Sequence, residues 1–173
     1  MRRNEFEEAE IRYIIRREER TVLGVVQQIG EPQKVYDDPC NLFVAKFLGT
    51  PPINVFNGSV KGGKLFIGED CIREVPGVAD QEVTVGIRPE GFILDENGPF
   101  HCTMRNVEVM GRDVSIVSEN ACSVNPIIRS IVSADSVKAH ITADQKTVSY
   151  AIKPHKVFIF SKEDEKRIYL EEK

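Results

Sequence analysis

The residues from Gly58 to Leu65, GSVKGGKL, are the stretch of this sequence that comes nearest to a nucleotide-binding motif. Their beginning fits G-x-x-x-x-G-K, the loop whose backbone N–H groups cradle phosphates. Leu65, however, stands where such a loop carries the serine or threonine that holds Mg²⁺. Gly62 and Gly63 suit a tight β-hairpin, because glycine adopts a positive φ without strain. We therefore predict a hairpin turn here and not a phosphate site.

The cysteines and histidines do not form a metal-binding or catalytic pattern. None of the four cysteines belongs to a C-x-x-C pair, and none has a histidine at zinc-finger spacing. No nucleophile is placed beside a base, so the sequence predicts no catalytic residue, no metal site and no cofactor. We interpret the cysteines as small apolar side chains in a reducing compartment; they are Cys40, Cys71, Cys102 and Cys122.

Composition narrows the class of partner. The 173 residues carry a net charge of −4, and only 8% are aromatic. Nucleic-acid binders are usually basic, and single-strand readers stack bases on aromatic rings. The apolar runs are only a few residues long, far short of a membrane span. We therefore expect neither nucleic-acid binding nor direct insertion into a membrane.

A charged start is followed by three short elements. Residues 1 to 20 hold six arginines and six glutamates, and we predict a helix, either solvated or partner-binding. Residues 21 to 30 predict a strand, and residues 31 to 39 a short helix with proline in its first turn. Residues 41 to 49, NLFVAKFLG, predict an amphipathic helix between an asparagine N-cap and a glycine stop.

From residue 53 onward, short β-rich runs dominate. Turn sequences such as KGGK, RPEG and MGRD separate them, and TPPIN before them predicts a linker. Many short strands at this spacing indicate a closed or sandwiched β fold. HIT, residues 140 to 142, is included among the strands, and SKEDEKRIYLEEK predicts a last strand or short helix. The expected domains are therefore residues 1–52 and 53–173.

The stretch GVVQQIGEPQKVYDDPCNLFVAKFLGTPPINVF, residues 24 to 56, resembles one protein family. It is similar to the end of the ATPase domain in ATP-binding subunits of bacterial ABC importers for maltose, oligosaccharides and glycerol-3-phosphate. VTVGIRPEGFIL, VEVMGRDVSIV and YAIKPHKVFIFSKEDEKRI resemble segments of that family's C-terminal domain. The matching positions in the first stretch are Gln28, Gly30, Pro32, Tyr36, Pro39, Asn41, Phe43, Val44, Ala45, Phe47, Gly49, Pro52 and Asn54.

The resemblance implies a mainly β fold: an OB-like β-barrel regulatory domain preceded by a short α/β segment. It implies a homodimer that works with transporter membrane subunits and regulatory proteins in the cytoplasm, at the inner face of the cell membrane. The family's Walker A, signature and Walker B motifs are missing from this sequence, so we expect no ATP hydrolysis. The chain would be a fragment, a degenerate gene product or a separate regulator. The alternative is a stand-alone OB-type module that binds a small anion or a sugar.

Two small sets of residues are candidates for function. Arg88 and Glu90 flank Pro89 after a predicted strand and either pair with each other or contact a partner, and the structural role is favoured. Arg112, in a predicted hairpin turn, is a further candidate for a partner contact. In the family the NLFVAKFLG helix packs on the ATPase core. Without that core Phe43, Phe47 and Leu48 need another cover, so we expect them to form an assembly surface.

Overall fold

The computed structural model describes residues 13–17, 25–142 and 144–170. Its first element is a two-stranded antiparallel hairpin of β1 (Tyr13–Arg17) and β2 (Val25–Gly30). The helix predicted over residues 1–20 is therefore wrong for residues 13–17, because these extend alongside β2. The rest of that prediction lies outside the described residues. Two short helices follow, α1 (Pro32–Asp37) and α2 (Leu42–Phe47), as the sequence predicts.

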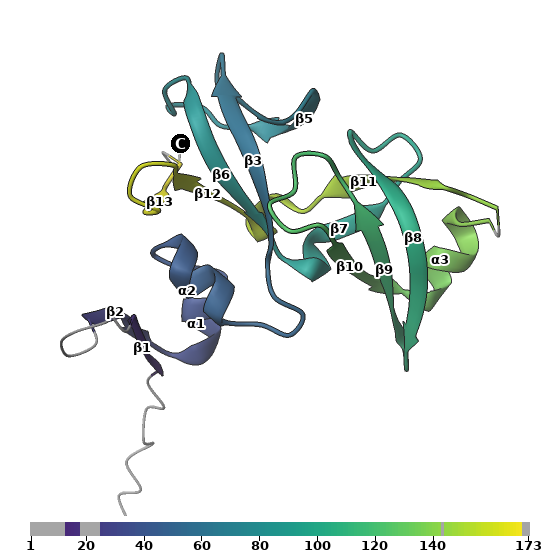
Figure 1. Ribbon diagram of the computed structural model, residues 1–173, viewed down its shortest axis with the longest axis horizontal. Coiled ribbons are helices and arrows are strands. Elements are labelled where there is room, and N and C mark those ends of the chain that lie inside the picture. The colour runs from purple at the N-terminus through teal and green to yellow at the C-terminus, as the bar shows by residue number, and fades with distance from the viewer. Residues whose placement is uncertain (1–12, 18–24, 143, 171–173) are drawn as a thin grey trace, which may run out of the picture.

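A six-stranded antiparallel sheet forms the half of the molecule nearest these helices (Figure 1). In the turn between β3 and β4, Gly62 and Gly63 have φ of 57° and 73°, so the near-match to a phosphate loop is a hairpin. The strand order is β13-β12-β6-β3-β4-β5. The bounds are β3 Asn54–Lys61, β4 Lys64–Ile67, β5 Asp70–Glu74, β6 Gln81–Ile87, β12 Val157–Ser161 and β13 Arg167–Ile168.

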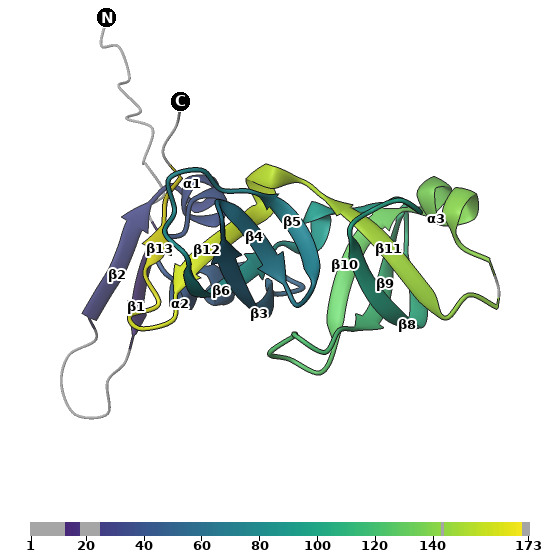
Figure 2. The ribbon, with the colours of Figure 1, turned by 90° about the horizontal axis from the view of Figure 1, so that it is seen from above.

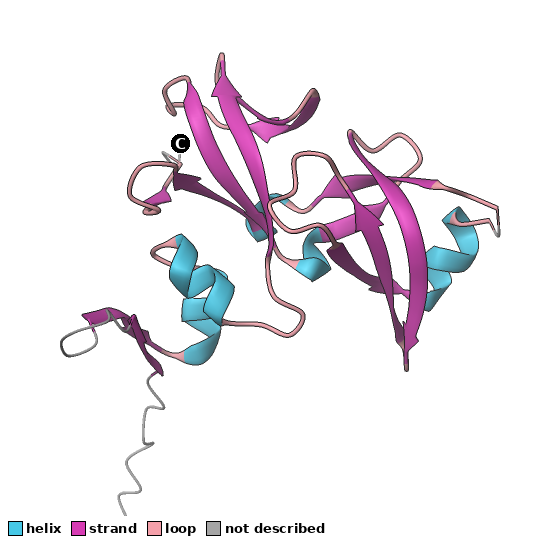
Figure 3. Ribbon diagram, viewed as in Figure 1, coloured by secondary structure: helices cyan, strands magenta, loops and turns pink. Residues whose placement is uncertain are grey.

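A five-stranded sheet in the order β10-β9-β8-β11-β7 forms the other half (Figures 1 and 3). Helix α3 (Ala134–His140) begins at the N-cap Ser133 and includes the first residue of the predicted strand HIT, which is therefore wrong. The hairpin of β8 and β9 turns at Gly111, with φ of 71°. The bounds are β7 Phe92–Leu94, β8 Phe100–Met110, β9 Asp113–Glu119, β10 Ile128–Ser133 and β11 Thr147–Ile152, with 3₁₀ turns η1 Pro89–Gly91 and η2 Pro154–Lys156.

One apolar core joins the two sheets. Phe56 of the first sheet meets Phe100 of the second edge to face, with ring centroids 5.3 Å apart, and Phe92 meets Tyr150 at 5.1 Å. The buried side chain of Asn54 also links the sheets: it donates to the carbonyl of Arg129 at 2.8 Å and accepts from its N–H at 2.9 Å. The predicted fold class, an OB-like mainly β barrel after a short α/β segment, is confirmed.

The two short helices pack on the chain's own barrel (Figure 2). Leu42 and Ala45 of α2 share a buried cluster with Phe158 and Phe160 of β12, among others. Backbone bonds add to the contact, from Leu42 N–H to the carbonyl of Glu165 and from Arg167 N–H to that of Cys40, both 3.0 Å. The barrel thus covers Leu42 and Ala45, while the expected assembly surface of Phe43, Phe47 and Leu48 remains a prediction. No helix among the described residues is long and apolar enough to cross a membrane.

Candidate functional site

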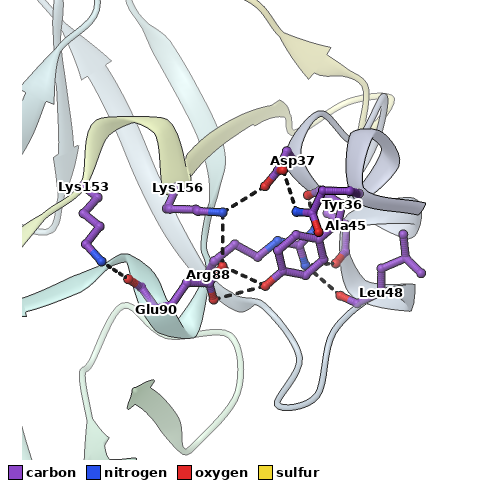
Figure 4. Close-up of polar contacts among 9 residues, drawn as sticks. Tyr36, Asp37, Ala45, Leu48, Arg88, Glu90, Lys153 and Lys156 are labelled. Atoms are coloured by element: carbon purple, nitrogen blue, oxygen red, sulfur yellow. Dashed lines mark hydrogen bonds and ion pairs between the residues drawn. The ribbon is translucent and has the colours of Figure 1, made fainter. Parts of the chain in front are cut away.

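The candidate site lies where the two short helices meet the barrel, and its centre is Arg88. Arg88 follows the end of β6. Its side chain is fully buried and is the largest among the fully buried side chains. Pro89 at the start of η1 ends the strand, as the sequence predicts, because proline has no N–H to donate to a sheet ladder. The guanidinium group thereby points at the C-terminal ends of α1 and α2 (Figure 4).

Three backbone carbonyls accept hydrogen bonds from Arg88. Its Nη1 donates to the carbonyls of Ala45 and Leu48 at 2.8 and 2.7 Å, and its Nη2 donates to that of Tyr36 at 2.7 Å. The last carbonyls of a helix have no partner within the helix, so a buried helix end needs outside donors. Arg88 therefore satisfies the ends of both helices at once, with a charged donor that also complements the helix dipoles.

The ring of Tyr36 completes the enclosure of Arg88. The guanidinium carbon lies 3.8 Å from the centre of the Tyr36 ring, a close cation–π contact. The Tyr36 hydroxyl donates to the carboxylate of Glu90, with oxygen distances of 2.9 and 3.1 Å. Gly49 keeps a φ of 110° beside them, and a Cβ there would lie 3.0 Å from Cε2 of Tyr36. A side chain at residue 49 would thus strain the backbone and press on the stacked ring.

Two lysines fix the carboxylate side of the site. The Nζ of Lys156 lies 2.9 Å from an Asp37 carboxylate oxygen and 3.3 Å from one of Glu90, so it bridges α1 and η1. Lys153 donates to the backbone carbonyl of Glu90 at 2.8 Å. The bridge supplements Arg88, since it joins the same two parts of the chain at the surface.

Electrostatics follow from this packing. Burial lowers the pKa of Arg88 from its usual value, while Tyr36, Glu90 and Asp37 act in the opposite direction. Burial, with the hydrogen bond to Glu90, raises the pKa of Tyr36 to about 12. Hydrogen bonds from Gln33 and Lys156 lower the pKa of Asp37 against its partial burial. At neutral pH the site thus holds a buried cation, a neutral phenol and surrounding carboxylates.

The arrangement around Arg88 holds three parts of the chain in fixed positions. The groups around Arg88 are carbonyls, a phenol and paired charges, and they contain no nucleophile next to a base. Among the described residues, no group of histidine, cysteine and acidic side chains is placed to hold a metal ion. The cysteines are free, and Cys102 alone of them is fully buried.

The candidate residues predicted from the sequence differ in burial and in the contacts they make. Arg88 and Glu90 form no direct ion pair; they interact through opposite parts of Tyr36. Arg112 is exposed at the β8–β9 turn. Phe43 and Leu48 are half-buried against Val35 and Val44, and Phe47 is 61% exposed.

Sequence reasoning missed the roles of Tyr36 and Lys156. Tyr36 stood among the matching positions of the resemblance, but nothing in its neighbours indicates a stack on an arginine 52 residues away. Lys156 is one lysine among many charged residues near the C-terminus. A sequence signal for them is weak: a short helix begins at Pro32, and Pro89 ends strand β6, so the residues at these two places are candidates for contact.

Comparisons with known proteins agree with the resemblance. The chain is 30% identical over 146 residues to the sn-glycerol-3-phosphate import ATP-binding protein of Ruegeria sp. strain TM1040, covering 84% of this chain and 40% of that protein. It is 31% identical to a putative ABC transporter ATP-binding protein of Mycoplasma pneumoniae, covering 84% and 24%. The diacetylchitobiose uptake system ATP-binding protein of Streptomyces coelicolor is 39% identical, covering 43% and 22%.

This chain is a relative of the ATP-binding subunits of ABC importers. It spans at most about two fifths of the length of the relatives named above, at 40% of the Ruegeria protein. No protein-family model matches the chain. Among solved structures, a cytoplasmic molybdate-binding protein aligns with a TM-score of 0.42 and 18% identity, over 61% of this chain and 94% of its own, which is too distant to bear on function.

Proposed function

We propose that the chain is the regulatory and dimerising portion of the ATP-binding subunit of a carbohydrate ABC importer. The observation that carries the proposal is the interlock around Arg88. Residues 32–48 belong to the stretch that resembles the end of an ATPase domain, and Arg88 joins them to the β-barrel by three buried hydrogen bonds. A barrel fixed in this way to the end of an ATPase domain is able to pass a change of position in one to the other.

In this proposal the chain itself neither binds nor hydrolyses ATP. The near-match to a phosphate loop is a hairpin with Leu65 buried and no helix behind it. The chain would work on the cytoplasmic side of the membrane, beside the membrane subunits of an importer, as a dimer.

Calorimetry with Mg-ATP tests the absence of a nucleotide site. We expect no saturable heat with the native chain and none with Lys64→Ala, which removes the lysine of the hairpin. Micromolar affinity that disappears in Lys64→Ala would contradict the proposal. Light scattering tests the dimeric state separately.

A further inference from the structure

A cavity of about 510 Å³ lies at the seam of the six-stranded sheet, the place where residues of both its edge strands line the same space. Strands β5 and β13 are the two edges of this sheet, and both contribute residues to the cavity wall. Arg73 of β5 closes part of the seam by donating from Nη1 to the carbonyl of Pro154 at 2.8 Å. Cavities of this size hold small molecules.

Arg167 of β13 lines the cavity with hydrogen-bonding capacity left unused. Its Nε and Nη1 are buried and have no hydrogen-bond partner among the described residues. The guanidinium group instead lies over aromatic rings, 4.4 Å from the centre of Phe158 and 5.6 Å from that of Tyr169. Buried polar groups without partners are rare and costly, so each one asks for an explanation.

The charges around Arg167 act on it in both directions. Burial lowers the pKa of Arg167 to about 10, whereas Asp38 and Tyr169 act to raise it and the nearby Arg73 acts to lower it. Two guanidinium groups that face one cavity repel each other unless an anion lies near them.

The carboxylates on the rim do not supply that anion. Asp37 is engaged by Lys156 at 2.9 Å and by the amide of Gln33 at 2.6 Å. Asp38 favours the charged form of Arg167, but no hydrogen bond or ion pair joins the two side chains among the described residues.

We propose that this cavity binds a small oxyanion, the phosphate or carboxylate group of a metabolite, against the guanidinium groups of Arg73 and Arg167. The apolar walls beyond them, including Pro76 and Leu170, would receive the rest of the molecule. A hydrogen bond to a charged group is stronger than one between neutral groups, and arginine matches both kinds of oxyanion. The inference is independent of the proposed function, because it rests only on the seam and its two arginines.

Calorimetry at constant ionic strength tests the site with inorganic phosphate, ribose 5-phosphate and succinate as probes. We expect saturable binding of at least one probe. Arg73→Gln and Arg167→Gln should each weaken it by about tenfold or more, the effect of losing a charged hydrogen bond. The matched control is Lys166→Gln, because Lys166 precedes Arg167 but its side chain is 77% exposed. It should change the affinity by less than about twofold.

The three probes also separate the possible head groups. Phosphate or ribose 5-phosphate binding alone assigns a phosphate site, and succinate binding alone assigns a carboxylate site. Tighter binding of ribose 5-phosphate than of phosphate would show that the apolar walls hold the body of the ligand. In ¹⁵N spectra, the Nε–H signal of Arg167, assigned from its loss in Arg167→Lys, should move as the site fills.

Glu171 and Glu172 follow the cavity residue Leu170 in the sequence, so their carboxylates are potential competitors. The titrations are therefore repeated on the double variant Glu171→Gln/Glu172→Gln. The proposal is overturned if no probe saturates with either protein. It is also overturned if Lys166→Gln weakens binding as much as the two arginine variants, because the effect would then be general attraction between charges.

Discussion

At the scale of single residues, the guanidinium group of Arg88 caps the C-terminal ends of both α1 and α2. Helices of six residues such as α1 and α2 leave most of their final carbonyls unpaired. The sequence indicates that Arg88 is important, and it favours a structural role. It cannot name the partners, because these are backbone carbonyls, which every residue has and no sequence pattern marks. The expected partner, Glu90, is instead bound to Tyr36 and Lys156.

Replacing Arg88 by methionine should strongly destabilise the protein. Methionine has a similar length but no donor, so the carbonyls of Tyr36, Ala45 and Leu48 lose their hydrogen bonds. Each buried group left unpaired costs about 1–3 kcal/mol, so we expect the free energy of unfolding to fall by about 3 kcal/mol or more. Urea denaturation measures the change. Arg112→Met at the exposed hairpin is the control and should stay within about 0.5 kcal/mol of the native chain. A loss below about 1 kcal/mol in Arg88→Met would contradict the interlock.

Tyr36→Phe should show a pH-dependent loss of stability. The variant keeps the ring over Arg88 but lacks the hydroxyl that donates to Glu90. The pKa of Tyr36 is raised from 10.0 to about 12 in the folded protein. The neutral phenol therefore stabilises the fold fully below pH 10, and this contribution disappears as the pH rises from 10 through about 12. Urea denaturation of both proteins at pH 8 and pH 11 should show a smaller difference at the higher pH. A difference that grows with pH would contradict this account.

At the scale of elements, the sequence predicts correctly those helices and turns whose ends carry a capping residue, a proline or a glycine pair. The asparagine N-cap of α2, the proline of α1 and the paired glycines before β4 all mark the predicted places. Strand β10 was missed, although its apolar residues Ile128 and Val132 alternate with polar Ser130 on the buried face. That face is polar in part because Ser130 bonds the hydroxyl of Tyr150, a partner that only the folded chain reveals. The short strand β1 was read as a helix because charge-rich stretches fit a helical period as well as a β-hairpin.

The N-cap of α2 offers a test at this scale. Asn41 accepts a hydrogen bond from the N–H of Val44 at 2.9 Å and donates to the side chain of Gln27 at 2.9 Å. Asn41→Ala loses both, and we expect a loss of about 1–2 kcal/mol in the free energy of unfolding. Asn41→Asp retains the cap acceptor and should recover most of that loss. If Asn41→Asp is as unstable as Asn41→Ala, the contact with Gln27 and not the cap is what stabilises the helix.

At the scale of the whole molecule, the two short helices between residues 32 and 47 pack against the barrel. Leu42 and Ala45 belong to a buried cluster with β12. Arg88 donates hydrogen bonds to carbonyls at the ends of both helices. The sequence could not foresee this, because the apolar surface available on the barrel depends on how β12 and β13 are arranged. The boundary between domains 1–52 and 53–173 remains a prediction. Among residues 26–52, the large apolar side chains that remain exposed are Val26, Ile29 and Phe47.

These exposed side chains support a homodimer, and they indicate which residue to substitute in order to test it. Val26, Ile29 and Phe47 are 45%, 54% and 61% exposed, and fully burying such a side chain contributes about 1.5–3 kcal/mol. We expect light scattering to give the mass of a dimer, and Phe47→Asp to give that of a monomer. Phe43 is a poorer choice for substitution, because its half-buried ring packs on the cluster with Val35 and Val44. Val109→Asp is the matched control, since Val109 is 76% exposed on the β8–β9 hairpin. A monomeric native chain would defeat the prediction, and dissociation by Val109→Asp but not by Phe47→Asp would move the interface to that hairpin.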